Sequence, residues 1–198
     1  MWTYEKKAAS SGFLYIAGVD EAGRGPLAGP VVSSAVILPP HFDEEGVTDS
    51  KKLSPSKRER FFDRICEKAV SVGIGVADHN EVDRLNILQA SLLSMIRAVE
   101  NLSVKPDHLL IDGIFTLSYP LKQQAIKKGD SLSISIAAAS IIAKVTRDRM
   151  MAHLDTEYPQ YGFAGHKGYP TKAHRDAIIR FGPCPIHRKS FSGVKEFV

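Results

Sequence analysis

The sequence lacks the features of a secreted, membrane-spanning or disulfide-stabilised protein. Its only two cysteines, Cys66 and Cys184, lie far apart and give no disulfide framework, so a reducing cytoplasm is the expected compartment. No apolar run approaches the roughly 18 residues that a membrane helix needs. The charged segment 1–9 leads into no long apolar stretch, which argues against a secretory signal. Internal repeats, low-complexity tracts and long linkers are also absent from the sequence.

The length of 198 residues, 43% of them hydrophobic, is enough for one well-buried core. We expect a single domain over residues 1–198, with a helical C-terminal region from about residue 158. The charge is uneven, because residues 1–121 carry −3 and residues 122–198 carry +7, which together make the formal net charge of +4. A basic half favours a polyanionic partner such as nucleic acid, although a solvated basic surface that binds nothing would give the same pattern.

The hydrophobic pattern predicts strands that alternate with helices, which is typical of an α/β layer fold. We expect strands over residues 14–20, 31–38, 72–77, 108–112 and 122–128. We expect helices over residues 55–70, 87–101, 134–157 and 172–181. The first three strands can pair as a meander, and the later strands can be added in parallel through helical crossovers.

The starts of the predicted helices carry residues whose side chains can accept a hydrogen bond from the free N–H groups there. These capping residues are Ser54, Asn86, Ser133 and Thr171. In the helix predicted over 87–101, the apolar period places one set of side chains on the buried side. That set is Leu88, Leu92, Leu93, Ile96 and Val99.

Acidic residues recur where the predicted strands end. Asp20 and Glu21 follow the first strand, Asp112 ends the fourth, and Asp130 precedes the long helix. Strand ends are where sites form in open α/β sheets, and carboxylates gathered there raise one another's pKa values unless a divalent cation intervenes. Oxygen ligands favour Mg²⁺ or Mn²⁺ over Zn²⁺. Two such ions can support the hydrolysis of a phosphodiester.

The adjacent acids Asp20 and Glu21 pose a geometric difficulty, because neighbouring strand residues point to opposite faces. Both can serve one site only if the chain turns there, which Gly18 and Gly23 would allow. Otherwise one of the two acts through its backbone carbonyl or from outside the inner set of ligands. A single aspartate after a strand is more often a loop starter than a ligand, so the metal hypothesis depends on the four acids together.

A glycine-rich loop, Gly23-Arg24-Gly25, follows the acidic pair. Glycines let the backbone approach a ligand closely, and its N–H and C=O groups could contact a ribose 2′-hydroxyl. Arg24 can donate to a phosphate. The alternative is a tight turn that only joins two strands. A nucleotide-binding P-loop is excluded, since the Gly-Lys-Ser/Thr ending is missing.

Polar residues on the predicted long helix recur at i, i+4 and i+7, as Ser140, Lys144 and Arg147. This spacing places them on one face, which would suit a phosphate backbone. An ordinary amphipathic helix would show the same stripe.

The segment 158–170 mixes aromatic and basic side chains, which could stack on nucleotides or simply fill a local core. Its members are Tyr158, Tyr161, Phe163, His166, Lys167 and Tyr169. Farther along, Cys184 and His187 form a lone Cys-x-x-His without a second cysteine pair, which argues against a zinc site.

Together these segments resemble ribonuclease HII, the bacterial type 2 ribonuclease H family. The matching stretches are 18–30 (GVDEAGRGPLAGP), 49–53 (DSKKL), 110–113 (LIDG), 128–130 (KGD), 135–148 (SIAAASIIAKVTRD), 166–169 (HKGY) and 182–184 (GPC), followed by His187-Arg188 and Ser190-Phe191. They cover nearly the whole chain in the family's order. The first motif and the long-helix motif are the most specific.

The resemblance implies a ribonuclease H-like fold, in which a central mixed β-sheet is flanked by helices and followed by a helical C-terminal part. It implies an endoribonuclease that hydrolyses the RNA strand of RNA–DNA hybrids. It also implies cleavage 5′ of ribonucleotides embedded in duplex DNA, as in ribonucleotide excision repair, which leaves 3′-OH and 5′-phosphate ends. Two Mg²⁺ or Mn²⁺ ions would take part.

The resemblance also assigns roles to individual residues. Four of them match the family's metal-site acids: Asp20, Glu21, Asp112 and Asp130. Gly23, Arg24 and Gly25 match its ribonucleotide-reading loop, and Tyr169 matches the tyrosine that packs at the RNA-to-DNA junction. The positions near phosphates are matched by Lys51, Ser140 and Lys144.

Departures from the family pattern are small. Ser192 and Gly193 stand where many members have a proline before Val-Lys, which bears only on how the tail packs. Neither a sliding-clamp peptide before Val198 nor the extra N-terminal domain of type 3 enzymes is evident. On the resemblance to the family we expect a monomer with no obligatory protein partner, and we expect no membrane association.

Two rival functions are compatible with clustered carboxylates and a basic half. A Holliday-junction resolvase or integrase-like nuclease would cut all-DNA junctions and ignore a ribonucleotide. A non-catalytic nucleic-acid-binding module would bind in a salt-dependent way and not cut. Clustered acids argue against a pure binder, because carboxylates without a metal repel phosphates.

Overall fold

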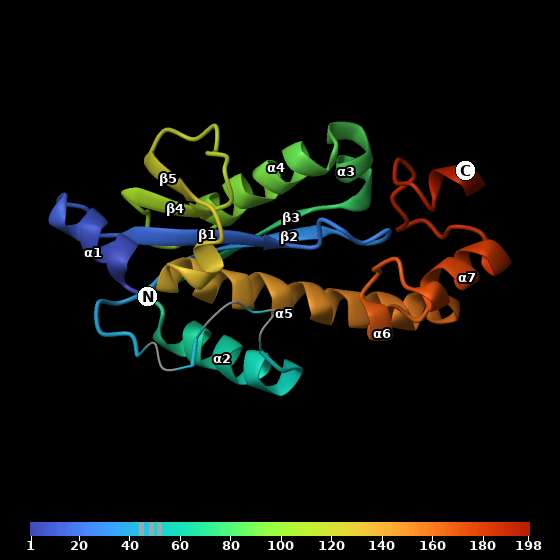
Figure 1. Ribbon diagram of the computed structural model, residues 1–198, viewed down its shortest axis with the longest axis horizontal. Helices are drawn as coiled ribbons and strands as arrows, with labels where there is room; N and C mark the ends of the chain where they lie inside the picture. The colour runs from blue at the N-terminus through green and yellow to red at the C-terminus, as the bar shows by residue number, and fades with distance from the viewer. Residues whose placement is uncertain (44–45, 48–49, 51–52) are drawn as a thin grey trace.

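The computed structural model of the protein describes residues 1–43, 46–47, 50 and 53–198, and it shows a sheet between two layers of helices (Figure 1). The helices α3 and α4 lie on one side of the sheet, and the long helix α5 lies on the other, with α2 outside it. The C-terminal helices α6 and α7 gather at the far end of α5 (Figure 1). This is the α/β arrangement, a sheet flanked by helices with a helical C-terminal part, that the sequence predicts.

The strands are β1 (Ile16–Ala22), β2 (Val31–Ile37), β3 (Ser71–Ala77), β4 (His108–Asp112) and β5 (Lys122–Ile126). The helices are α1 (Thr3–Ser10), α2 (Pro55–Lys68), α3 (His79–Leu85), α4 (Ile87–Glu100), α5 (Ile134–Glu157), α6 (Phe163–His166) and α7 (Lys172–Phe181). Short 3-10 turns are η2 (Gly129–Ser131), η3 (Pro159–Tyr161) and η4 (Lys195–Phe197).

The five strands lie in the order β3-β2-β1-β4-β5. The predicted meander is confirmed, since β1 pairs antiparallel with β2 and β2 pairs antiparallel with β3. The strands β4 and β5 are added in parallel beside β1, also as predicted. The predicted helical crossover is right for β4, which follows α3 and α4, but wrong for β5, because residues 113–121 form no helix. The first strand also starts later than predicted and continues beyond Asp20 to Ala22.

The long helix α5 packs directly against the backbone of β1. A Cβ atom added to Gly18 would lie 2.1 Å from the carbonyl carbon of Ser135 in the first turn of α5. Ile134, Ile141 and Ile142 of this helix are fully buried. A side chain at position 18 is therefore excluded by the backbone of the helix, which fixes the distance between α5 and the strand that carries Asp20.

The helix α4 covers the other face through small residues, which corrects the sequence prediction. A Cβ atom at Gly75 would lie 2.0 Å from the carbonyl oxygen of Ser94, and one at Gly73 would lie 2.1 Å from that of Ala98. Because α4 approaches β3 this closely, small side chains face the sheet. Of the predicted buried set, Val99 is fully buried, whereas Leu88, Leu92, Leu93 and Ile96 are only partly buried beside the contact.

All four predicted helix caps are present. Ser54 accepts a hydrogen bond from Lys57 N–H, Ser133 from Ile136 N–H and Thr171 from His174 N–H. The Asn86 side chain accepts from two N–H groups of α4. Helices α1 and α3 were not predicted, although α3 begins with a capping box between Asp78 and Glu81 that the sequence spells as Asp-x-x-Glu.

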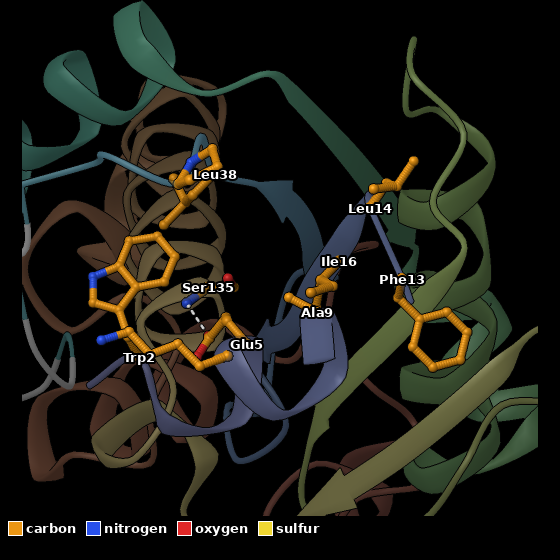
Figure 2. Close-up of a pocket in the computed structure, with 10 residues that line it drawn as sticks. Trp2, Glu5, Ala9, Phe13, Leu14, Ile16, Leu38 and Ser135 are labelled. Carbon is orange, nitrogen blue, oxygen red and sulfur yellow. Dashed lines mark hydrogen bonds between the residues drawn. The ribbon is translucent and has the colours of Figure 1, made fainter. Parts of the chain in front are cut away.

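The unpredicted helix α1 packs against the start of α5. Glu5 of α1 is buried and accepts hydrogen bonds from the Ser133 hydroxyl at 2.5 Å and the Ser135 N–H at 3.0 Å. A carboxyl group there lies at the positive end of the helix dipole. Figure 2 shows Glu5 beside Ser135, with Trp2 and Leu38 around a cavity of about 210 Å³. The first turn of α5, which follows Asp130 closely, is thus held from outside the sheet.

None of the helices in the described part of the chain has the length and apolar character that a membrane crossing requires.

We predict that Gly18→Ala destabilises the fold, because its Cβ would enter the backbone of α5. The free energy of unfolding in urea should fall by about 1–3 kcal/mol, the usual cost of overpacking a core. Gly165→Ala is the matched control, since a Cβ atom there meets nothing within 4 Å. Equal stability of the two variants would contradict the close contact between β1 and α5.

Candidate active site

Asp20 and Asp112 stand side by side at the ends of neighbouring strands. In the parallel pair of β1 and β4, Val19 is opposite Ile111, and each acid is the next residue along its strand. Asp20 is buried, with 3% of its surface exposed. The sheet register therefore brings together two acids that are 92 positions apart in the chain.

Both aspartates are on the α5 side of the sheet. Gly18, two residues before Asp20, faces the first turn of α5. Leu110, two residues before Asp112, packs in a cluster with Ile136 of α5. Because strand side chains alternate, the residues two positions on share that face.

Glu21 points the other way, because β1 does not bend at the acidic pair. The strand stays paired with β2 through Ala22 opposite Val32. Glu21 lies at the strand end, where it lines clefts on both sides of the sheet edge. The turn that would place both side chains on one face is absent, so the geometry favours the other expectation, in which Glu21 acts through its backbone or from outside the inner ligands.

Asp130 lies in the η2 turn between β5 and α5 and is 6% exposed. The preceding residue, Gly129, donates its N–H to Asp112 Oδ1 over 2.6 Å. This hydrogen bond ties the turn that carries Asp130 to the end of β4. The fourth predicted acid is therefore held beside the same strand end as Asp112.

The proximity of the acids shifts their pKa values. Burial raises the pKa of Asp20 well above its ordinary value, and repulsion from Glu21 and Asp112 raises it further, against the hydrogen bonds from Ser140 and from the Glu21 N–H. Burial also raises the pKa of Glu21, and Asp112 adds to the rise, whereas Arg24 lowers it. These carboxyl groups are held where their charged forms are disfavoured.

The donor set fits hard divalent cations, because it consists of carboxylate oxygens whose repulsion a cation would remove. Among the described residues, no three His, Cys, Asp or Glu side chains already form a metal cage. The acids also have protein partners, since Asp20 accepts from the Glu21 N–H and from Ser140, Asp112 accepts from Gly129 N–H, and Glu21 pairs with Arg24 at 3.5 Å. A bound cation would replace or reorient these contacts.

A cleft of about 480 Å³ opens beside the acids. Six of the seven residues predicted to contact substrate line it: Gly23, Arg24, Gly25, Ser140, Lys144 and Tyr169. The seventh, Lys51, lies outside the described residues. Ser50 and Arg58 also line the cleft, and sequence reasoning did not single out Arg58. We call this space the basic cleft.

Ser140 links the basic cleft to the acids. Its hydroxyl hydrogen-bonds to Asp20 and lies 2.9 Å from the Ser50 hydroxyl. The buried chain Ser50–Ser140–Asp20 orients the carboxylate from the α5 side.

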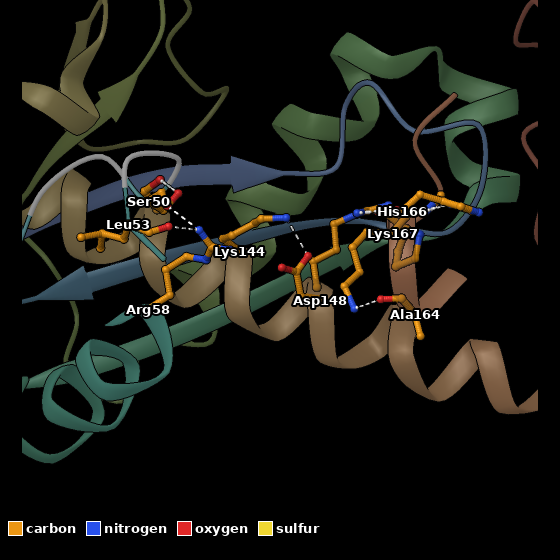
Figure 3. A network of polar contacts seen from close by, with 12 residues as sticks. Ser50, Leu53, Arg58, Lys144, Asp148, Ala164, His166 and Lys167 are labelled. Atoms are coloured by element: carbon orange, nitrogen blue, oxygen red, sulfur yellow. Dashed lines mark hydrogen bonds and ion pairs between the residues drawn. The ribbon is translucent and has the colours of Figure 1, made fainter. Parts of the chain in front are cut away.

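The basic side chains that line the basic cleft form hydrogen bonds and ion pairs with neighbouring residues (Figure 3). Lys144 donates to Asp148 over 2.7 Å, and burial lowers the pKa of its ammonium group. Arg58 of α2 donates to the Ser50 and Leu53 carbonyls at 2.9 and 2.5 Å. The positive charges are therefore positioned before any substrate arrives.

The loop between β1 and β2 is fixed by Arg188, which is fully buried. Its guanidinium donates to the carbonyls of Gly23 at 2.6 Å, Arg24 at 3.1 Å, Pro26 at 2.8 Å and Gly29 at 2.9 and 3.0 Å. Burial, with repulsion from Arg147, lowers the pKa of Arg188 to about 9, so it remains charged at neutral pH.

Arg147 supports the same loop, which corrects its predicted place on a phosphate-binding face. It is 1% exposed and donates to the carbonyls of Pro30 at 2.9 Å, Ala28 at 3.3 Å and Lys167 at 3.0 Å. Its Nε atom lies 2.1 Å from where a Cβ atom of Gly23 would stand, and Gly23 has a φ of +102°. Only Ser140 and Lys144 of the predicted stripe face the cleft.

The two arginines turn the loop carbonyls inward. Among the described residues, the N–H groups of Gly23, Arg24 and Gly25 meet no protein acceptor. These N–H groups are therefore available to a ligand at the mouth of the basic cleft.

Tyr169 faces this loop across the cleft and is 42% exposed. A Cβ atom at Gly25 would lie 3.5 Å from its ring. By contrast, Tyr161 and Phe163 are buried, so the core-packing alternative is right for them.

A buried histidine pair holds the backbone of Tyr169. Cys184 N–H donates to His187 Nδ1, so the His187 proton is on Nε2 and faces His174 Nε2 at 3.0 Å. His174 then donates from Nδ1 to the Tyr169 carbonyl at 3.0 Å. Burial lowers the pKa of both histidines to about 4, which keeps them neutral. His187 thus has a structural role.

We predict that Asp20→Asn stabilises the metal-free protein at neutral pH. The folded-state pKa of Asp20 lies above its ordinary value of 3.8, so ionisation of this group reduces the stability of the folded protein. The loss begins as pH rises past about 3.8 and is complete above the folded-state pKa. Thermal unfolding should show a variant more stable than the wild type at pH 8, with the difference closing toward pH 3. Lower stability of the variant at pH 8 would contradict the repulsion.

We predict that Arg188→Lys weakens the loop, because an ammonium has three donors and lacks the planar fork. Carbonyls left unpaired should lower the free energy of unfolding by about 1–3 kcal/mol in urea titration. The exposed Arg175→Lys is the control and should be neutral. An unchanged free energy of unfolding for Arg188→Lys would show that the contacts to the carbonyls do not stabilise the fold.

Comparisons with known proteins identify the family. The family model described as Ribonuclease HII matches residues 17–194. The curated Ribonuclease HII of Geobacter metallireducens is 61% identical over 198 residues, which span 100% of this chain and 93% of the relative. The solved ribonuclease H2 of Pyrococcus horikoshii aligns with a TM-score of 0.77 and 28% identity, over 93% of this chain and 97% of that chain.

A chain from the PCNA:RNase HII complex of Archaeoglobus fulgidus aligns with a TM-score of 0.75 and 26% identity, over 90% of this chain and 96% of that chain. The match of fold and sequence thus extends over almost the whole protein. The chain belongs to the ribonuclease HII family and is a ribonuclease H, an endonuclease that acts on RNA–DNA hybrids.

Proposed function

We propose that this ribonuclease H cuts on the 5′ side of a ribonucleotide, both in RNA–DNA hybrids and in duplex DNA that carries single ribonucleotides. The products would carry 3′-OH and 5′-phosphate ends, and the cut would open ribonucleotide excision repair. The observation that carries the proposal is the juxtaposition of Asp20 and Asp112 beside the basic cleft.

The acids would hold two Mg²⁺ or Mn²⁺ ions, through the side chains of Asp20, Asp112 and Asp130 and through Glu21. When bound, such a pair activates a water for attack at phosphorus and stabilises the departing 3′ oxygen. Ser140 keeps the Asp20 carboxylate oriented, and Gly129 does the same for Asp112. The protein's contribution is to place the acids before substrate binds.

The loop N–H groups of Gly23, Arg24 and Gly25 would test for the ribose 2′-hydroxyl, which accepts as well as donates hydrogen bonds. Tyr169 would pack on the next sugar, because its exposed ring stands across the cleft from Gly25. Lys144 and Arg24 would neutralise backbone phosphates, so binding should weaken steeply with salt. The phosphate contact expected for Lys51 remains a prediction, because this residue lies outside the described residues.

No obligatory protein partner is needed for this chemistry, and the monomeric state stays a prediction. The Archaeoglobus fulgidus relative is described in a complex with PCNA. Cleavage rates on a single-ribonucleotide duplex and on a long hybrid, each measured with Mg²⁺ and with Mn²⁺, would give the preferred substrate and the preferred metal.

The two rival functions make different predictions. A resolvase would cut an all-DNA junction, and a binding module would not cut at all. Membership of the ribonuclease HII family favours ribonucleotide-directed cleavage over both.

We predict that the protein cleaves a labelled DNA duplex with one ribonucleotide at its 5′ side, only when Mg²⁺ or Mn²⁺ is added. Asp112→Asn should reduce the cleavage rate by about 10³-fold or more, because a ligand for charge stabilisation is lost. Gel mapping of the labelled products locates the cut and identifies the ends.

Asp176→Asn is the matched control, since this aspartate is exposed on α7 and pairs only with Lys172 among the described residues. It should cleave and melt like the wild type. Asp112→Asn should bind the hybrid and should melt no lower than the wild type, because it removes repulsion from Asp20 and Glu21. Full activity of Asp112→Asn, or cleavage of an all-DNA duplex at equal rate, would overturn the proposal.

A further inference from the structure

A second cleft, of about 210 Å³, lies on the opposite side of the Glu21–Arg24 ion pair. It runs between the first turns of α4 and the segment that follows β4. Its walls are formed by Leu88, Ser91, Leu92, Met95 and the segment 112–115. Glu21 and Arg24 line both this cleft and the basic cleft, so the two spaces meet at the ion pair. We call it the apolar cleft.

The two clefts differ in charge. The basic cleft has Arg24, Arg58 and Lys144 in its walls. In the apolar cleft Arg24 is the only cation among the described lining residues. It pairs with Glu21, and Asp112 is a second acid among the lining residues. A phosphate entering the apolar cleft would thus meet more negative than positive charge. The uncharged parts of a nucleotide, its sugar and base edge, are compatible with these walls.

The segment that forms the outer wall is anchored. Gln123 of β5 accepts from Leu117 N–H at 2.8 Å and donates to the carbonyls of Leu117 at 2.9 Å and Tyr119 at 2.8 Å. Leu117 itself is buried in the core between the sheet and α4. The exposed residues just before it therefore project from a fixed base.

Those residues are Ile114, 69% exposed, and Phe115, 46% exposed. They follow Asp112 by two and three positions and face the cleft that contains it. Single exposed apolar residues need no explanation, but an adjacent pair held beside the catalytic acids provides a surface on which a sugar or base can pack. Aromatic rings are common platforms for this, since every base has a stacking face.

We propose that the apolar cleft receives the sugar and base edges of the nucleic acid directly beyond the scissile phosphate, with Phe115 and Ile114 as positioning residues. This inference rests on the proposed function. The strand lies with its phosphates along the basic cleft, passes the Glu21–Arg24 pair and continues over Phe115. Phe115 thereby helps to set the scissile phosphate against Asp20 and Asp112.

The first test is steady-state cleavage of the single-ribonucleotide duplex by Phe115→Ala and Ile114→Ala. KM should rise about tenfold for Phe115→Ala, the effect of losing one stacking contact, with kcat within about twofold. The dependence of KM on salt should stay as in the wild type, because no phosphate contact is removed. Phe181→Ala is the matched control, since Phe181 is 48% exposed and lies on α7 outside both clefts.

The second test removes one base from the substrate instead of the aromatic ring from the protein. Duplexes with one abasic position, moved stepwise away from the ribonucleotide on either strand, are cleaved by wild type and by Phe115→Ala. One abasic position should raise the wild-type KM and leave that of Phe115→Ala unaffected, which identifies the nucleotide on Phe115.

Wild-type KM in both alanine variants, an equal defect in Phe181→Ala, or additive effects at every abasic position would overturn the inference while wild-type cleavage stands. Failure of the wild type to cut the ribonucleotide duplex with metal would instead remove the proposed function, and with it this role for the cleft.

Discussion

Arg188 and Arg147 direct their guanidinium donors to backbone carbonyls of the loop between β1 and β2. An unpaired buried carbonyl costs about 1–3 kcal/mol, so a loop with so many inward carbonyls exists only because these side chains satisfy them. The N–H groups of Gly23, Arg24 and Gly25, which line the basic cleft, have no protein acceptor among the described residues. Arg188 comes from the C-terminal tail and Arg147 from the middle of α5. The loop between β1 and β2 therefore takes its shape from residues more than a hundred positions away.

The acids at the strand ends act against the stability of the metal-free fold. Burial and mutual repulsion raise the pKa values of Asp20 and Glu21, so their ionised forms reduce the stability of the metal-free protein. The close contact between Gly18 and α5 keeps the strand in place despite this cost, and the Gly129 N–H bond keeps Asp112 beside the η2 turn. A rigid scaffold thus holds charges that would otherwise separate. Such a site gains stability when a cation is bound, which links metal binding to the fold.

Much of the fold follows from patterns within a few residues. The caps at Ser54, Asn86, Ser133 and Thr171 and the bounds of α5 and α7 were predicted correctly, because capping and helical periodicity are local. The buried side predicted for α4 was right for Val99 but only partly right for Leu92 and Ile96, which pack beside the core. Glycines in β3 let the helix approach closely, so that its small residues face the sheet. Helix α1 was missed, since its place depends on a contact between Glu5 and α5 that no local pattern reports.

The sequence by itself determined the family and the α/β class, and it proposed the acids and the loop of the candidate site, because motif identity is a property of the chain. Only the tertiary structure decided how these residues meet. Strand register put Asp20 beside Asp112, and an unbroken β1 sent Glu21 to the other side. Arg147, which the spacing placed on a phosphate-binding face, is buried and donates to backbone carbonyls instead. Register and burial depend on which segments pack together, and such long-range contacts leave no periodic mark in the sequence.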